Sequence, residues 1–166
     1  MRLTLLPPLH ESNRLRALHI RSDDNRDYAA FDWHDEAPIR DSWYYRAVGR
    51  SGSHLIEIEI ADELLRSVDF LVGRATPDLF DVARSMSRVE LDAHPRLALE
   101  ALDTESVACV IPRGVDVKRD VQIWRCPGRL IVGFGFDDAR RAFGVGPNVT
   151  YFTTEAMQLV GLDLRA

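Results

Sequence analysis

The clearest pattern in this chain is a strict alternation of side-chain type over residues 54–60. Isoleucines fill every second position from Ile56 to Ile60, with glutamates between them. Successive side chains of a β-strand point to opposite faces of a sheet, so the pattern predicts a half-buried strand whose isoleucines belong to the core. We therefore expect a sheet that is built around this strand.

Apolar spacing and turn residues predict the other elements. Strands are expected at residues 3–6, 44–48, 106–111, 121–126, 130–136 and 149–152. Helices are expected at 62–72, 76–86 and 94–102, with shorter ones at 137–143 and 154–160. The segment 11–20 fits either a short helix or a strand.

The helix assignments depend on residues that typically begin and end helices. Asp62 can cap the first helix, and Pro77 and Pro95 suit the first turn of the next two. Gly73 and Gly161 stand where helices would end. These signals favour an α+β fold, with a mixed or antiparallel sheet of about five strands packed against two or three helices.

Length and composition predict one compact domain over residues 1–166. The hydrophobic fraction is 46% and the charged fraction is 28%, both ordinary for a globular protein that needs no disulfide or metal to fold. Cys109 and Cys126 each lie in a β-like run, and we expect them to be reduced thiols packed in the core.

The charge balance argues against nucleic acid as a partner. The formal net charge is −5, and Lys118 is the single lysine of the chain, so attraction to phosphate backbones would be weak without a concentrated basic patch. The apolar run at the N-terminus is too short for a signal peptide, and no later stretch is long enough to span a bilayer. The expectation is a cytoplasmic protein that binds no membrane.

Residues 28–45 form an aromatic-acidic segment, which holds six of the fourteen aromatic residues of the chain. Aromatic rings supply large contact area at low entropic cost, and carboxylates supply directional partners for cations, so the mixture is typical of a recognition surface. The candidate partner-binding residues are Asp32, Trp33, Asp35, Glu36, Arg40, Asp41, Trp43 and Tyr44.

An acidic recognition surface implies a basic protein partner, because opposite charge speeds association. A small acidic cytoplasmic immunity protein, which neutralises a basic bacterial toxin by binding it, would have this composition. Two alternatives stay open. One is a small hydrolase-like enzyme that uses His34 with Asp35 and Glu36, or His54, and the other is a homodimeric structural subunit.

No sequence motif indicates a cofactor or a metal. The five histidines never occur at the spacing of a zinc site. Gly133 and Gly135 resemble part of a phosphate-binding loop, but Asp137 and Asp138 follow them and would repel pyrophosphate. We expect these glycines to allow close packing of strands instead.

Overall fold

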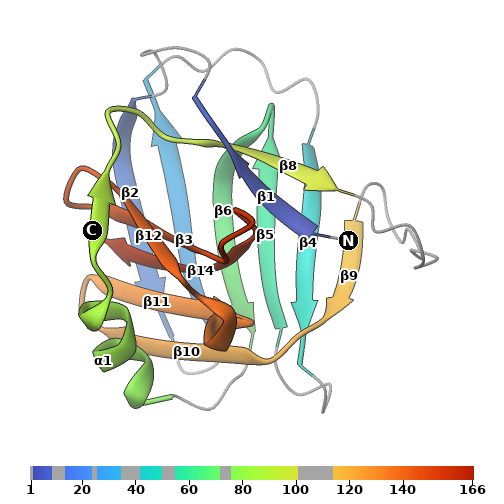
Figure 1. Cartoon of the computed structure of the whole chain (residues 1–166), viewed down its shortest axis with the longest axis vertical. Helices are drawn as coiled ribbons and strands as arrows, with labels where there is room; N and C mark the ends of the chain where they lie inside the picture. The colour runs from blue at the N-terminus through green and yellow to red at the C-terminus, as the bar shows by residue number, and fades with distance from the viewer. Residues whose placement is uncertain are drawn as a thin grey trace.

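The computed structural model describes residues 2–8, 14–23, 26–34, 42–49, 55–71, 76–100 and 114–166. The described residues form three β-sheets, one α-helix and one short 3-10 helix (Figure 1). The chain is therefore predominantly β, and the expected α+β fold with two or three helices packed on one sheet is wrong.

The first sheet has six described strands in the order β2-β3-β6-β5-β4-β9. Their bounds are Leu15–Ser22 (β2), Arg26–Trp33 (β3), Leu64–Leu71 (β6), Leu55–Ala61 (β5), Ser42–Val48 (β4) and Gly114–Lys118 (β9). All neighbours are antiparallel except β9, which runs parallel to β4 at the edge.

The second sheet has six described strands in the order β10-β11-β14-β13-β12-β7. Their bounds are Val121–Cys126 (β10), Arg129–Phe134 (β11), Leu159–Arg165 (β14), Val149–Thr153 (β13), Arg141–Val145 (β12) and Arg88–Glu90 (β7). The two large sheets share one connectivity. In each, a hairpin is followed by a three-stranded meander whose last strand pairs with the hairpin, and a parallel strand covers the far edge.

A small third sheet pairs β1 (Arg2–Leu6) with β8 (Arg96–Glu100). It contacts both large sheets through the backbone. The amide of Leu5 donates to the carbonyl of Met157 at 2.9 Å, and the amide of Leu97 donates to the carbonyl of Glu63 at 2.8 Å. Leu3, Leu5 and Leu97 thereby join the core that the large sheets enclose.

The two large sheets pack face to face with their strands crossing. In Figure 1 the strands of the first sheet run nearly vertically, while β10, β11 and β14 run nearly horizontally. Such crossed sheets bury the inward side chains of both layers. Ile56, Ile58 and Ile60 are fully buried there, which confirms the strand predicted from their alternation. Residues of the second sheet that face them include Leu130, Val132, Phe134, Tyr151, Leu162 and Leu164.

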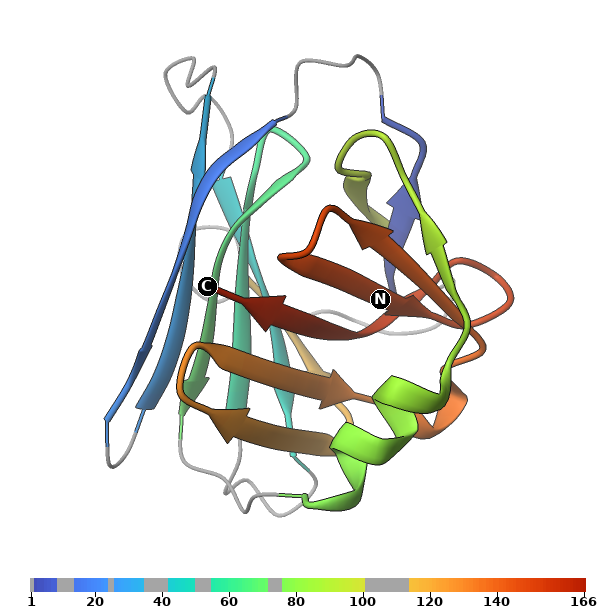
Figure 2. The same ribbon diagram turned by 90° about the vertical axis from the view of Figure 1, so that its left-hand side faces the viewer.

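The helix α1 (Asp78–Ser85) lies on the face of the second sheet that points away from the first sheet (Figure 2). Its buried Leu79 and Ala83 pack with Ile131 and Phe152 in a second, smaller cluster. The start signal at residues 76–78 predicted this helix correctly. In the part of the chain that the structure describes, no helix is both long and apolar enough to cross a bilayer.

The helix predicted at 62–72 is instead strand β6. Asp62 and Glu63 have φ values of 51° and 64°, so they form a two-residue hairpin turn and do not begin a helix. Such turns need positive φ at both central positions and match the twist of the flanking strands. A β-bulge shifts the register of β6 between Leu65 and Ser67, so its buried residues Leu65 and Val68 are three positions apart and imitate a helical stripe.

Two other predicted helices are also strands. The helix expected at 94–102 is replaced by β8 at 96–100, which completes the small sheet. The helix expected at 154–160 is a turn at 154–157 followed by β14, a central strand of the second sheet. The short helix expected at 137–143 is only the 3-10 turn Phe136–Asp138, and β12 follows it. In each case pairing with a strand distant in sequence overrides local helix signals.

Most predicted strands are confirmed within a residue or two, among them β1, β4, β10, β11 and β13. The ambiguous segment 11–20 contributes to strand β2. The strand expected at 106–111, together with Cys109, lies outside the described residues. Cys126 is a free thiol, but it is exposed and not buried as expected.

Gly133 and Gly161 leave room for the aromatic ring of Phe136 to pack against the second sheet. The two glycines lie opposite each other on β11 and β14, and Phe136 packs over both. A Cβ atom at 161 would lie 2.5 Å from Cδ2 of Phe136 and 2.9 Å from the carbonyl oxygen of Val132. The glycine therefore serves close packing, as the sequence suggested for Gly133, and it does not end a helix.

We predict that Gly161→Ala lowers the free energy of unfolding by about 1–3 kcal/mol, because the added methyl overpacks the ring of Phe136. Urea denaturation monitored by circular dichroism would measure this. In a Phe136→Ala background the same change should cost less, and the remaining cost would come from the close approach to the carbonyl oxygen of Val132. An equal cost in both backgrounds would show that Phe136 is not the cause.

Candidate functional site

The aromatic-acidic segment contributes two strands that are not neighbours. β3 and β4 are separated in the first sheet by β6 and β5. Along each strand the side chains alternate, so Phe31, Trp33 and Tyr45 enter the core. Asp32 and Tyr44 point to the outer face of the sheet, because they lie next to these inward residues.

Trp33 is a core residue in this structure. It is only 4% exposed, and its indole Nε1 donates to the carbonyl of Leu65 at 3.0 Å. Its ring also meets the ring of His94 edge-on, with 4.8 Å between centroids. Trp43 is half-buried and packs against the same core. Of the two tryptophans proposed as anchors, Trp33 is therefore not available on the surface.

Four of the predicted partner-binding residues lie outside the described residues, namely Asp35, Glu36, Arg40 and Asp41. Of the other four, Asp32 and Tyr44 are on the outer face of the first sheet. Asp32 lies 3.8 Å from the Nε atom of Arg16 in a partly exposed ion pair.

Strand pairing brings further acidic side chains to this outer face. Glu57 on β5 lies opposite Asp69 on β6, and Glu59 lies opposite both Ser67 on β6 and Tyr44 on β4. We call this surface the acidic face and define it by the outward residues of four neighbouring strands. Its acidic and aromatic members are Tyr28, Asp32, Tyr44, Glu57, Glu59 and Asp69. Two arginines of the same strands share this face, because Arg46 lies opposite Glu57 and Arg26 binds Asp69.

Three hydroxyl groups hold the carboxylate of Glu59. Ser42 and Ser67 each donate from Oγ at 3.1 Å, and Tyr44 donates from its phenol at 3.4 Å. Burial and the neighbouring charge of Glu59 raise the pKa of Tyr44, so its hydroxyl keeps the proton that it donates. Glu59 is thus fixed in position by three hydrogen bonds.

Asp69 is fixed by Arg26, which donates to both of its carboxylate oxygens. Hydrogen bonding to Asp69 raises the pKa of Arg26 above its ordinary value. The guanidinium carbon of Arg26 also lies 5.7 Å from the centre of the Tyr28 ring. This corner of the acidic face is a preformed stack of a carboxylate, a guanidinium and an aromatic ring.

Glu57 has a less favourable environment. Burial is the largest cause that raises its pKa, Arg46 offsets part of this, and the charges of Asp69 and Glu59 raise it further. Half-burial beside two like charges penalises the ionised form, and a further cation would relieve that penalty.

No described element covers the acidic face. Figure 2 shows the first sheet edge-on, with the second sheet and α1 both on its other side. The outer face of this sheet of six described strands is therefore uncovered, and its carboxylates and tyrosines lie among outward arginines such as Arg26 and Arg46. Sequence reasoning missed Glu57, Glu59 and Asp69 as site residues, although the alternation in β5 already placed its glutamates opposite the core.

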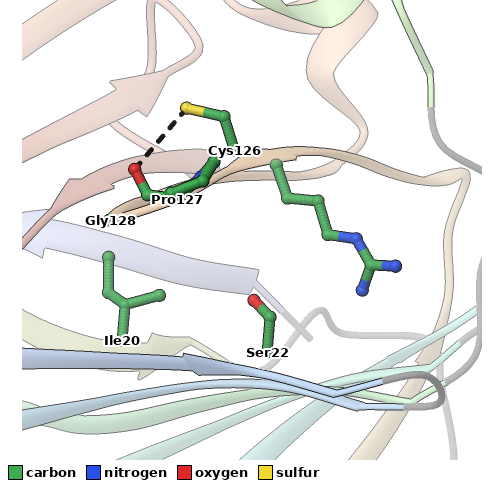
Figure 3. Close-up of a pocket in the computed structure, with 6 residues that line it drawn as sticks. Ile20, Ser22, Cys126, Pro127 and Gly128 are labelled. Carbon is green, nitrogen blue, oxygen red and sulfur yellow. Dashed lines mark hydrogen bonds between the residues drawn. The ribbon is translucent and has the colours of Figure 1, made fainter.

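A cavity of about 470 Å³ lies between the edge of the first sheet and the β10–β11 turn (Figure 3). It is lined by Ile20, Ser22, Arg125, Cys126, Pro127 and Gly128. In Figure 3 the Cys126 thiol points away from Ile20 and Ser22, and its contact is with the Pro127 carbonyl at 3.8 Å. These described lining residues include no histidine or carboxylate that could act as a base for the thiol.

Arg125 closes this cavity toward the core. Its Nη1 donates at 3.1 Å to both carboxylate oxygens of the buried Asp27. Because Arg125 belongs to β10 and Asp27 to β3, the ion pair joins the two large sheets. Its arrangement indicates a structural role.

The enzyme alternative depended on His34 and His54. His34 is exposed just after β3, while its expected partners Asp35 and Glu36, and His54 itself, lie outside the described residues. Within the described ranges, no three His, Cys, Asp or Glu side chains are grouped so that they could hold a metal ion.

His94 is the histidine that the fold buries. Its Nδ1 lies 2.9 Å from the hydroxyl of Tyr151, and burial lowers its pKa from 6.5 to about 4. Burial also raises the pKa of Tyr151, so the pair is neutral near pH 7. A neutral pair enclosed by Trp33 is a polar contact of the core.

The sequence matches no model of a known protein family and no curated protein. Function must therefore be argued from the geometry of this chain.

His94 predicts a pH dependence of stability. The unfolded chain takes up a proton at His94 as the pH falls below about 6.5, whereas the folded protein does so only near pH 4. The wild type should therefore lose about 2 kcal/mol more than His94→Gln between pH 7 and pH 5. Urea unfolding of both proteins at the two pH values tests this, and parallel losses would contradict it.

Proposed function

We propose that the acidic face of the first sheet binds a basic protein. The observation that carries the proposal is a full, uncovered sheet face on which Glu57, Glu59 and Asp69 lie on neighbouring strands beside two tyrosines. Tyrosine supplies rigid contact area with a polar end, and carboxylates supply acceptors for Arg and Lys.

Preorganisation supports this use of the face. Glu59 is held by three hydroxyl groups, and Asp69 is held by Arg26, so neither carboxylate needs to be ordered when a partner arrives. Binding then costs less side-chain entropy. Glu57 adds to this, because burial and the neighbouring carboxylates raise its pKa beyond what Arg46 offsets, and a guanidinium or ammonium group placed against it would favour its ionised form.

The finer proposal is an immunity protein that neutralises a basic toxin by covering its surface. A net charge of −5 and a flat acidic face both favour fast association with a cationic protein. Asp32 and Tyr44 remain candidate contacts from the original set, and Glu57, Glu59 and Asp69 join them.

The test compares the wild type with the double variant Asp32→Asn/Glu57→Gln. The wild type is immobilised to capture a basic protein from host lysate, and stopped-flow kinetics with the purified partner follow at low and moderate salt. The double variant should associate at least about tenfold more slowly at low salt and show a weaker salt dependence.

The matched control is Asp137→Asn/Glu155→Gln, which removes two exposed charges from loops of the second sheet. It should associate like the wild type, because the change in net charge is the same while the acidic face is intact. Equal rates for the wild type and both double variants, or a lysate that yields no basic partner, would contradict the proposal.

A further inference from the structure

A cavity of about 440 Å³ lies on the opposite side of the molecule, between α1 and the outer face of the second sheet. Phe80 and Met86 form its wall on the helix side, and Thr150, Phe152 and Asp163 form its floor on the sheet. This volume is in the range of pockets that hold small molecules.

Four arginines line this cavity, which we call the arginine cavity, although the net charge of the protein is negative. Arg84, Arg88, Arg129 and Arg165 line it, while Asp163 is the single carboxylate among its described lining residues. A concave wall of one sign concentrates the opposite charge, so the cavity attracts anions.

Asp163 is already paired with Arg129 and Arg165, so it does not offset the positive charge of the other two arginines. Arg129 donates to it from Nε at 2.9 Å and from Nη2 at 2.8 Å, and Arg165 donates from Nη2 at 2.8 Å. Burial alone would raise the pKa of Asp163, but these hydrogen bonds outweigh burial and hold the pKa below its usual range.

Arg129 is rigid as well as paired. Its guanidinium carbon lies 4.8 Å from the ring centre of Phe80 and 5.6 Å from that of Trp124, and the two rings stack at 4.6 Å. Its bonds to Asp163 use Nε and Nη2, so Nη1 lies outside that ion pair. A fixed guanidinium loses little entropy when it binds an anion.

Arg88 and Arg84 bring two further guanidinium groups to the cavity, of which Arg88 is paired with a carboxylate outside the lining. Arg88 pairs with Glu90 at 2.8 Å and donates to the carbonyl of Gly146. It lies flat over the sheet because position 144 is a glycine, where any Cβ would overlap its guanidinium. Arg84 is exposed on the last turn of α1, and in the part of the chain that the structure describes it makes no hydrogen bond or ion pair.

We propose that the arginine cavity binds a small organic phosphate. A phosphate group offers three acceptor oxygens and up to two negative charges, which suits several guanidinium groups that converge from different elements. The rings of Phe80 and Phe152 provide apolar surface for the organic part. A simple carboxylate, with one charge and two oxygens, matches this surplus of donors less well.

The test is isothermal titration calorimetry with phenyl phosphate as the probe, at constant ionic strength and at a pH where the phosphate is a dianion. The wild type should bind it, and Arg84→Gln and Arg88→Gln should each weaken the binding about tenfold or more. Because Arg84 is exposed and makes no hydrogen bond or ion pair with described residues, its variant should fold normally, which circular dichroism would verify.

The matched control is Arg141→Gln, which removes an exposed arginine of the same sheet that pairs with Glu155 and does not line the cavity. It should bind phenyl phosphate like the wild type. Absence of binding to the wild type, or equal weakening by Arg141→Gln and Arg84→Gln, would overturn the proposal. Benzoate that binds as tightly as phenyl phosphate would overturn the assignment to phosphate.

Discussion

The burial of one face of β5 is the constraint on which the rest of the structure depends. Ile56, Ile58 and Ile60 are completely enclosed between two crossed sheets, and a slip of one residue would exchange them for Glu57 and Glu59. The register of the central strands is therefore strongly specified. The same alternation that builds the core also places the glutamates on the acidic face.

The outer faces of the two sheets carry charge in different arrangements. On the first sheet, carboxylates lie beside arginines of neighbouring strands, as in the pairs Arg26–Asp69 and Arg46–Glu57. On the second sheet, four arginines line one cavity beside α1, where Asp163 is the single carboxylate among the described lining residues. The two faces therefore suit different ligands: the first offers carboxylates for contact with a basic protein, and the second offers a concave site for an anion.

Local sequence patterns predicted secondary structure correctly where the residues of a segment alone determine its conformation. The isoleucine alternation predicted β5, and the proline and aspartate at 77 and 78 predicted α1. Leu64, Leu65, Val68 and Leu71 suit a helix as well as a doubly paired strand, so only pairing with β3 and β5 decides between them. Strand pairing depends on residues that are distant in the sequence. The same holds for β8, which pairs with β1, and for β14, which pairs with β11.

The candidate site was predictable in part for the same reason. Strand alternation sends Asp32 and Tyr44 outward and Trp33 inward, but an aromatic-acidic composition alone does not show which rings the core requires. Arg26 and Asp69 lie on different strands and are 43 residues apart in the sequence, so no short sequence motif predicts their contact. The arginine cavity likewise assembles from α1 and five strands.

The central claim is that the acidic face binds a basic protein through carboxylates that include Glu57. The most direct measurement is the pKa of Glu57 by NMR of the labelled side-chain carboxyl, in the free protein and in the complex with the captured basic protein. We predict a pKa above the ordinary glutamate value in the free protein and a lower pKa in the complex. An ordinary pKa in the free protein, or one that does not change on binding, would contradict the account.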